Sequence, residues 1–334
     1  MNNRDHKQST FKEAILLVNL GTPSDAEYFP TWRFLASFLS DSRVIEIPKL
    51  LWYPILYGII LPFRSYASAE KYKNIRSEEQ GMPLYYHSKN ILEKLRKRIA
   101  RDDIIIELCM TYEKPNIREA MRELKKQHIK SLVVLPLFPQ YSATTTASIM
   151  DIIGQEFANW RFIPNFQFIN GYWDHPAYID VICQQIVAHK RRVKQQRKLI
   201  ISYHGLPKRN LKLGDPYYCL CHKTTRLIAE NLSLKETDYT MTFQSRFGPS
   251  EWLQPYTEDT LRDLAKSGHT ELDIIAPGFI TDCLETDDEI KREYQETFTE
   301  AGGEKLHYIA AMNDSKEAIE FFYQLIRSRT HIIS

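Results

Sequence analysis

Runs of apolar residues alternate along this chain with segments whose apolar positions recur every three or four residues. The apolar runs are rich in Val, Ile and Leu, and they lie at 14–20, 104–110, 131–138, 198–204 and 272–279. The segments with helical spacing lie at 89–100, 117–127, 177–196 and 257–268. Such runs are typical of strands buried on both faces, and the helices provide the crossovers that parallel strands need. The pattern therefore predicts an α/β fold with parallel sheets flanked by helices.

The strand pattern of the first half is repeated in the second half. A strand followed by a Gly-containing turn occurs in ILLVNLGTP and again in LIISYHGLP, and a strand with a Pro and a Phe occurs in VVLPLFPQYS and in DIIAPGFITD. We therefore expect two similar domains, residues 11–165 and 166–330, with the final helix able to pack back on the first domain. Ligands of open parallel sheets bind beyond the carboxyl ends of the strands, so the four turns are expected to face one cleft.

An uncharged segment of 14 residues, LLWYPILYGIILPF at 50–63, interrupts this pattern. A membrane-spanning helix needs about 20 apolar residues, and this segment also contains two prolines, so it is too short and too broken to span. Two interpretations remain open. The segment is either a buried helix or an apolar lip that dips into the surface of a bilayer, with its Trp and Tyr residues at the interface.

Composition indicates a protein of the cytosol that does not bind nucleic acid. The 334 residues are 43% hydrophobic and 26% charged, and the formal net charge of +2 provides no basic surface for a nucleic acid. An odd number of cysteines, five in a chain of this length, favours a reducing compartment. The first ten residues, MNNRDHKQST, are polar, and no apolar signal-peptide core follows them.

Carboxylates gather directly after the last apolar run. Asp282 precedes Glu285, Glu289 and Glu293, whose spacing of four residues places them in one stripe on a helix. A helix N-terminus favours negative charge, which explains Glu285 but not Glu293, deeper in the helix. His204 lies at the end of its own strand and is expected to face the same cleft. A histidine opposite a row of carboxylates suits a divalent first-row metal, or proton removal with an exit path along Asp282, Glu289 and Glu293.

Five longer stretches make the chain similar to the ferrochelatases, which insert ferrous iron into protoporphyrin. They are LLVNLGTP, LPLFPQYSATTTAS, SYHGLP, TFQSRFGPSEWLQPYTEDTL and PGFITDCLET, and they occur in the family's order. The resemblance extends from residue 14 to about residue 325. It implies two Rossmann-like domains with parallel four-stranded sheets flanked by helices, and a porphyrin between them. It also implies that Fe²⁺ enters protoporphyrin IX with release of two protons, the terminal step of haem biosynthesis.

The resemblance also implies roles for individual residues. The family's invariant histidine falls on His204 and its essential glutamate on Glu285, which makes these two the expected catalytic and metal-binding residues. The family's acidic row falls on Glu289 and Glu293. The lip falls on 50–63, and the expected porphyrin contacts are Leu20, Arg64, Tyr72, Tyr141, Ser245, Arg246, Trp252 and Phe279. Arg64 and Tyr72 match positions linked to the propionates and the pocket edge, and an arginine binds a carboxylate bidentately.

The chain departs from the family in two places. Thr111 stands where many members have Arg, which removes a cationic contact. No cysteine follows Cys283, so we expect no iron–sulfur cluster, unlike in animal members, and iron enters only as a substrate. Cys219 and Cys221 are separated by one residue, which is poor geometry for a single tetrahedral ion, so a structural or incidental role is favoured.

Alternative functions stay open from the sequence. The chain is either a chelatase for protoporphyrin, a chelatase for another porphyrin such as coproporphyrin III or for another metal, a haem or porphyrin carrier without catalysis, or a membrane-surface scaffold. The long apolar lip favours protoporphyrin over a tetracarboxylate, and a carrier has no need of the acidic row. The expected location is the cytoplasm, peripherally on the inner membrane, with the preceding haem-pathway oxidase as a partner.

Overall fold

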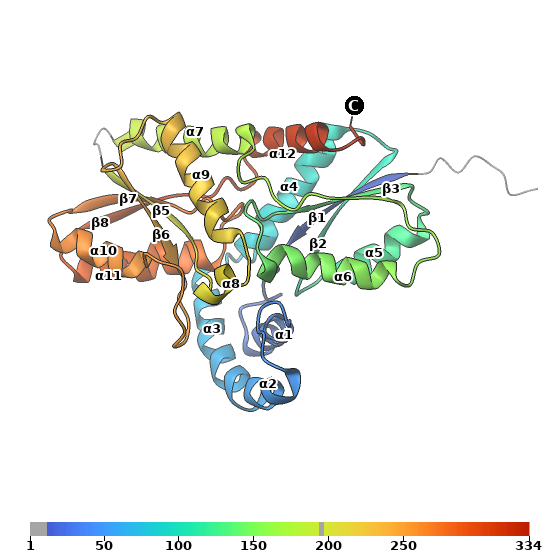
Figure 1. The fold of residues 1–334 in the computed structure, drawn as a ribbon, viewed down its shortest axis with the longest axis horizontal. Helices are drawn as coiled ribbons and strands as arrows, with labels where there is room; N and C mark the ends of the chain where they lie inside the picture. The colour runs from blue at the N-terminus through green and yellow to red at the C-terminus, as the bar shows by residue number, and fades with distance from the viewer. Residues whose placement is uncertain (1–11, 194–196, 334) are drawn as a thin grey trace, which may run out of the picture.

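Two four-stranded parallel sheets form the centre of the molecule in the computed structural model, which describes residues 12–193 and 197–333 (Figure 1). The first sheet has the order β2-β1-β3-β4, built from β1 (Glu13–Asn19), β2 (Ile104–Met110), β3 (Ser131–Pro136) and β4 (Asn165–Phe168). The second has the order β6-β5-β7-β8, built from β5 (Lys198–His204), β6 (Tyr239–Gln244), β7 (Glu271–Ile275) and β8 (Lys305–Ile309). The predicted fold class is confirmed. The polar N-terminal ten residues and the last three residues of the helix expected at 177–196 lie outside the described residues.

Helices cover both faces of each sheet (Figure 1). Those of the first half are α4 (Pro83–Ile99), α5 (Ile117–Lys126), the short π-helix η2 (Ala143–Ala147) and α6 (Ser148–Phe157). Those of the second half are α7 (Pro176–Val193), α8 (Lys208–Lys212), α9 (Tyr217–Asn231), α10 (Thr257–Lys266), the π-helix η3 (Glu285–Tyr294), α11 (Gln295–Glu300) and α12 (Lys316–Arg329). The central strands β1 and β5 are buried almost throughout, as expected for parallel strands with helices on both sides.

The last helix, α12, lies against α4 of the first half and against α7 of the second. The Arg98 guanidinium of α4 forms an ion pair with Glu320, 2.9 Å between Nε and Oε2, and its Cζ lies 3.6 Å from the centre of the Tyr323 ring. Ala318, Phe322 and several neighbours on α12 are fully buried in the core that both halves share. The halves are therefore joined by packing as well as by the connecting chain.

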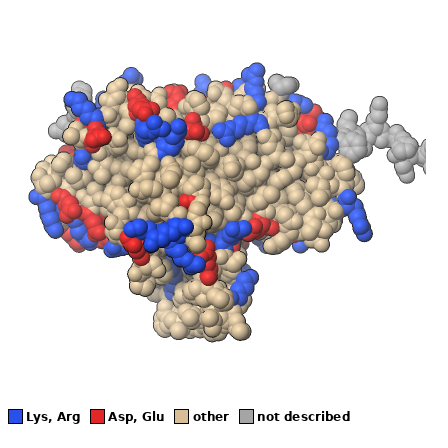
Figure 2. All heavy atoms as spheres, in the orientation of Figure 1, with Lys and Arg blue, Asp and Glu red and all other residues tan. Residues whose placement is uncertain are grey.

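A helical arm projects from the body below the two sheets (Figure 1). It consists of α1 (Tyr28–Leu39), α2 (Lys49–Ile55), the π-helix η1 (Leu56–Ile60) and α3 (Leu61–Ile75). The segment 50–63 has two different faces: Trp52 is buried and donates from Nε1 to the Leu39 carbonyl at 2.7 Å, whereas Leu50 is 88% and Phe63 76% exposed. Figure 2 shows that the tip of the arm carries almost no charged side chains. Among the described residues, no helix has the length and apolarity to cross a membrane.

Candidate active site

The carboxyl ends of the two sheets meet through polar contacts between the halves. Asn19, at the end of β1, donates from Nδ2 to Ser88 Oγ at 3.0 Å and to Thr281 Oγ1 at 3.4 Å, and Thr281 follows β7. Within the second half, the Tyr178 hydroxyl donates to the Pro277 carbonyl at 2.7 Å and holds the turn that precedes Thr281. Because ligands of such sheets bind beyond the carboxyl ends of the strands, these contacts locate the candidate active site.

His204 ends β5 and has a fixed tautomer. Its Nδ1 lies 2.6 Å from the Gly205 carbonyl oxygen, and since a carbonyl can only accept, Nδ1 must carry the proton. Nε2 is then the unprotonated nitrogen of the neutral ring. The Phe279 ring lies beside it, with 6.4 Å between the ring centres. The lone pair of the neutral His204 ring is therefore on Nε2.

Gly205 keeps this histidine close to the neighbouring strand β6. The Gly205 amide donates to the Gln244 carbonyl at 2.7 Å, and His204 and Gln244 are partners in the parallel register of β5 and β6. A Cβ added at Gly205 would lie 2.7 Å from the Gln244 oxygen and 3.1 Å from the Trp252 ring. Only glycine leaves room for this approach, so the turn after His204 requires it.

The acidic row lies on a π-helix and not on a regular α-helix. Glu285, Glu289 and Glu293 all belong to η3, and the Gln244 amide donates to the Glu285 carbonyl oxygen at 3.0 Å. π-helices are rare and occur frequently at functional sites. The sequence predicted the row but not the widened helix, because the spacing of the residues is compatible with either.

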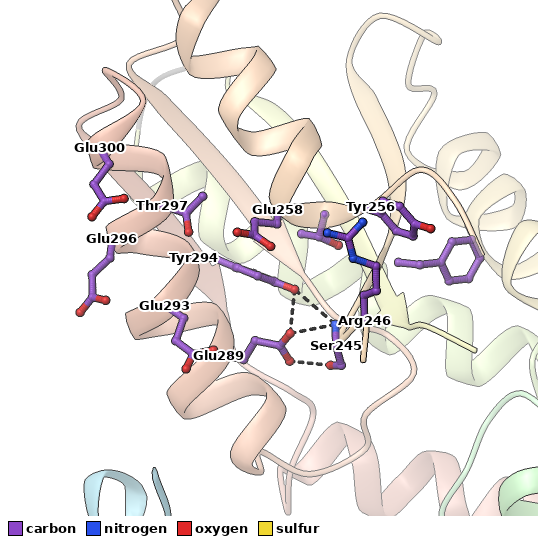
Figure 3. Close-up of a pocket in the computed structure, with 12 residues that line it drawn as sticks. Ser245, Arg246, Tyr256, Glu258, Glu289, Glu293, Tyr294, Glu296, Thr297 and Glu300 are labelled. Carbon is purple, nitrogen blue, oxygen red and sulfur yellow. Dashed lines mark hydrogen bonds between the residues drawn. The ribbon is translucent and has the colours of Figure 1, made fainter. Parts of the chain in front are cut away.

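Glu289 accepts hydrogen bonds at both carboxylate oxygens (Figure 3). The amide of Ser245 and the Tyr294 hydroxyl donate to Oε1 at 2.8 and 2.7 Å, and the Ser245 hydroxyl and the Gln244 amide donate to Oε2 at 2.5 and 3.1 Å. Burial raises the pKa of Glu289, against the opposing effects of these donors and of the charge on His204. The histidine and this carboxyl group are thus electrostatic neighbours.

The other expected acids have different partners. Glu293 forms ion pairs with Lys71 of α3 at 2.6 Å and with Arg292 at 3.0 Å. Asp282 is buried and accepts from the Tyr308 hydroxyl and from the Asn313 amide, both at 2.7 Å. The structure therefore brings Glu289 to His204, whereas the Glu285 side chain lies near Tyr72 and Cys283. Glu293 is paired with the arm, and Asp282 is hydrogen-bonded within the protein wall.

Arg64 and Tyr72 lie on α3, on the arm side of the site. Burial raises the pKa of Tyr72, and the negative charge of Glu285 acts in the same direction, which makes Tyr72 a neighbour of that glutamate. Burial also lowers the pKa of Arg64, whose Cζ lies 4.1 Å from the centre of the Phe247 ring. The expected propionate contact and the expected metal-binding glutamate are therefore linked through Tyr72.

The remaining expected porphyrin contacts lie on several different elements around the candidate site. Leu20 packs on the aromatic cluster of the arm, Tyr141 lies within electrostatic range of Arg43, and Trp252 packs over Gly205. Arg246 stacks on Tyr256, with its Cζ 4.3 Å from the ring centre, and lines a separate cavity.

The cavity that Arg246 lines, called the outer cavity below, measures about 350 Å³ and lies between the end of β6, the start of α10 and the helices η3 and α11 (Figure 3). Ser245 and Glu289 are also part of its wall, so it adjoins the Glu289 site. Its other carboxylates belong to Glu258, Glu293, Glu296 and Glu300.

Thr111, at which the chain departs from the family, has hydrogen-bond partners of its own. Thr111 is buried and bonds the Asn19 carbonyl from both its amide and its hydroxyl, at 2.9 and 3.2 Å. Cys219 is exposed whereas Cys221 is fully buried, so the two thiols face different environments. Within residues 12–193 and 197–333, no group of three or more His, Cys, Asp or Glu side chains has the arrangement of a metal site.

The sequence did not predict Gln244 and Tyr294 as site residues. The only feature of the sequence that could have indicated them is that each is adjacent to a predicted residue.

Comparison with known proteins agrees with this geometry. The ferrochelatase family pattern matches residues 12–330. Ferrochelatase 2 of Shewanella oneidensis is 46% identical over 318 residues, which cover 95% of this chain and 97% of that protein. The ferrochelatase of Herminiimonas arsenicoxydans is 46% identical, over 94% of this chain and 86% of that protein. A solved structure of the sirohydrochlorin chelatase SirB from Bacillus subtilis, in complex with cobalt, is similar in fold alone, with a TM-score of 0.58 at 11% identity over 96% of both chains. The chain therefore belongs to the ferrochelatase family, whose members are enzymes that insert a metal ion into a porphyrin.

Proposed function

We propose that this ferrochelatase inserts Fe²⁺ into protoporphyrin IX, releases two protons and forms protohaem, with His204 and Glu285 as the catalytic and metal-contacting residues. The observation that carries the proposal is the tautomer of His204. Its Nδ1 proton is directed to the Gly205 carbonyl, which leaves the Nε2 lone pair for a pyrrole proton. A neutral imidazole is the side chain best suited to accept a proton at physiological pH.

Proton removal continues through Glu289. Its pKa is raised by burial, so it takes up a proton at a pH at which an exposed glutamate stays ionised. The protonated imidazole next to it is an adequate donor, and the outer cavity, with Glu293, Glu296 and Glu300 in its wall, leads toward solvent. Metal insertion is balanced when two protons leave for each Fe²⁺ that enters. Asp282 takes a supporting part in this path by fixing the segment before η3.

Porphyrin recognition involves both halves. Arg64 and Tyr72 receive a propionate at the arm side, and Phe279 packs beside His204 at the ring centre. Leu20, Tyr141, Ser245, Arg246 and Trp252 complete the proposed set of contacts. Coproporphyrin carries two more carboxylates than protoporphyrin, and the exposed side chains of the segment 50–63 at the tip of the arm are apolar, which favours protoporphyrin. Coproporphyrin III remains the alternative substrate.

The tip of the arm supports an association with a membrane surface. Leu50, Leu51, Ile59 and Phe63 are more than half exposed and form one apolar end of the molecule (Figure 2). An apolar helical segment of this kind lies in the interface of a bilayer without crossing it. We propose on this basis that the protein acts in the cytoplasm, peripherally on the inner membrane, with the preceding oxidase of the haem pathway as a partner.

The proposal is tested by supplying protoporphyrin, coproporphyrin, Fe²⁺ and Zn²⁺ in turn and following the porphyrin spectrum. We expect insertion into protoporphyrin by the native protein. We expect none by His204→Ala, which still binds porphyrin, as shown by quenching of its Trp fluorescence. Turnover by His204→Ala would refute the role of the imidazole. Binding without turnover by the native protein would favour the carrier.

A further inference from the structure

Arg64 is a half-buried cation without an anionic partner. Within the described chain it forms no ion pair and no side-chain hydrogen bond, and burial lowers the pKa of its guanidinium. Removing a charge from water without a partner is costly. The one strong contact at this side chain is with Phe247, whose ring centre lies 4.1 Å from Cζ. The contact joins the arm to a loop of the second half.

The loop that carries Phe247 is anchored at its start. Ser245 adopts a left-handed φ of 64° and bonds Glu289 through both its amide and its hydroxyl. The next two side chains then diverge: Arg246 stacks on Tyr256 at the outer cavity, and Phe247 reaches Arg64. Phe247 is 57% exposed, so burial in a core does not account for its position.

The chemistry of the stack indicates its use. An aromatic ring covers one face of a guanidinium, whereas the five N–H donors lie in the guanidinium plane and stay available. A carboxylate binds in that plane with two parallel hydrogen bonds. A stacked arginine without a carboxylate is therefore a preformed receptor for one.

We propose that Phe247 is a positioning residue that holds the plane of Arg64 for a carboxylate of the porphyrin, and thereby selects tetrapyrroles that carry propionates. The inference rests on the proposed function. Phe247 itself touches neither the metal nor the reacting nitrogens. Its contribution is to binding, and it leaves the insertion step unchanged.

The test compares Phe247→Ala with Phe247→Trp, using Zn²⁺ and two porphyrins: protoporphyrin and its dimethyl ester, which lacks the carboxylates. An exposed cation–π contact is worth about 0.5–1 kcal/mol, so we expect Phe247→Ala to raise KM for protoporphyrin about two- to fivefold with kcat unchanged. Phe247→Trp restores KM, and the ester shows no difference. In an Arg64→Met background, Phe247→Ala has no further effect. Phe162→Ala is the matched control, because Phe162 is 62% exposed and lies far from the arm between α6 and β4.

The outcomes separate this inference from the proposed function. A native protein that inserts Zn²⁺ while Phe247→Ala retains its KM would overturn the role of Phe247 and leave the chelatase intact. An equal rise of KM for the ester, or a fall in kcat at constant KM, would show a structural role and contradict the inference as well. A native protein that metallates neither porphyrin would refute the proposed function.

Discussion

Replacing Tyr294 by Phe tests whether Glu289 takes part in proton removal. The ring of Tyr294 is buried, and its hydroxyl donates to Glu289 Oε1 at 2.7 Å. The substitution keeps the ring and deletes one of the donors to a buried carboxyl group. Three donor contacts, two from Ser245 and one from Gln244, remain.

The size of the effect follows from the lost hydrogen bond. A hydrogen bond to a charged group contributes about 1.5–3 kcal/mol, and about 1.4 kcal/mol corresponds to one pKa unit. Because the bond stabilises the carboxylate, its loss raises the pKa of Glu289, already raised by burial, still further. If Glu289 must be ionised to accept a proton, the acid limb of the insertion rate moves to higher pH, and the rate on that limb falls about tenfold or more, the factor to which 1.5–3 kcal/mol corresponds.

The same change affects stability in a pH-dependent way. A carboxyl group whose pKa is raised in the folded state contributes stability that is complete below its unfolded pKa and is lost as the pH rises through the folded pKa. Tyr294→Phe therefore destabilises the protein more at pH 8 than at pH 5. Urea unfolding at the two pH values measures this difference.

The assay is a pH profile of Zn²⁺ insertion into protoporphyrin for the native protein, Tyr294→Phe and Tyr112→Phe. Tyr112 is a matched control, because its hydroxyl donates to the carboxylate of Asp41 at 2.8 Å, away from η3. We expect the control to keep the native profile. A Tyr294→Phe profile that superimposes on the native one would show that Glu289 carries no proton.

Three further changes test other parts of the structure. Replacing Leu51 and Ile55 by Asp should weaken association with liposomes about tenfold or more, because each apolar side chain contributes about 1.5–3 kcal/mol on burial; unchanged sedimentation with liposomes would make the arm tip a purely structural surface. Gly205→Ala should slow metal insertion at least tenfold with an unchanged circular dichroism spectrum, because the added Cβ meets the Gln244 oxygen at 2.7 Å and shifts His204. A native rate would show that the close approach of residue 205 to Gln244 does not require glycine. Asp215→Ala should lower the free energy of unfolding, measured by urea titration, by about 3 kcal/mol. The carboxylate accepts three buried or half-buried hydrogen bonds, two of them from donors in the first half. A loss below about 1 kcal/mol would mean that water takes the place of the carboxylate as acceptor.

The sequence predicts the central strands and the edge strand β2 well, and the other three edge strands poorly. β1, β3, β5 and β7 lie inside the sheets and are nearly continuous apolar runs. β4 and β8 are edge strands of four and five residues with exposed positions, and β6 alternates polar and apolar residues, so none of them resembles a buried parallel strand. Five of the eight strands were therefore visible in the sequence, whereas the number of strands in each sheet came from the resemblance to the family.

The sequence likewise predicts some residues of the candidate site and misses others. His204 and the acidic row could be recognised in the sequence because each follows an apolar run, and the end of such a run predicts the end of a strand. The partners of Glu289 are not apparent, because Gln244 and Ser245 lie 45 and 44 positions away along the chain. The ion pair of Lys71 with Glu293 connects segments still farther apart along the chain, and no periodic pattern in the sequence predicts it. The catalytic roles of these residues stay predictions until the substitutions are measured.

The position of α12 has a consequence for how the protein is made. This helix leaves the ribosome more than 200 residues after α4, yet it covers part of α4. Until α12 arrives, the apolar surface of α4 that it covers is open to water and to chaperones. The first half therefore completes its core only after α12 has emerged, and before that point a nascent chain has no finished porphyrin site to fill.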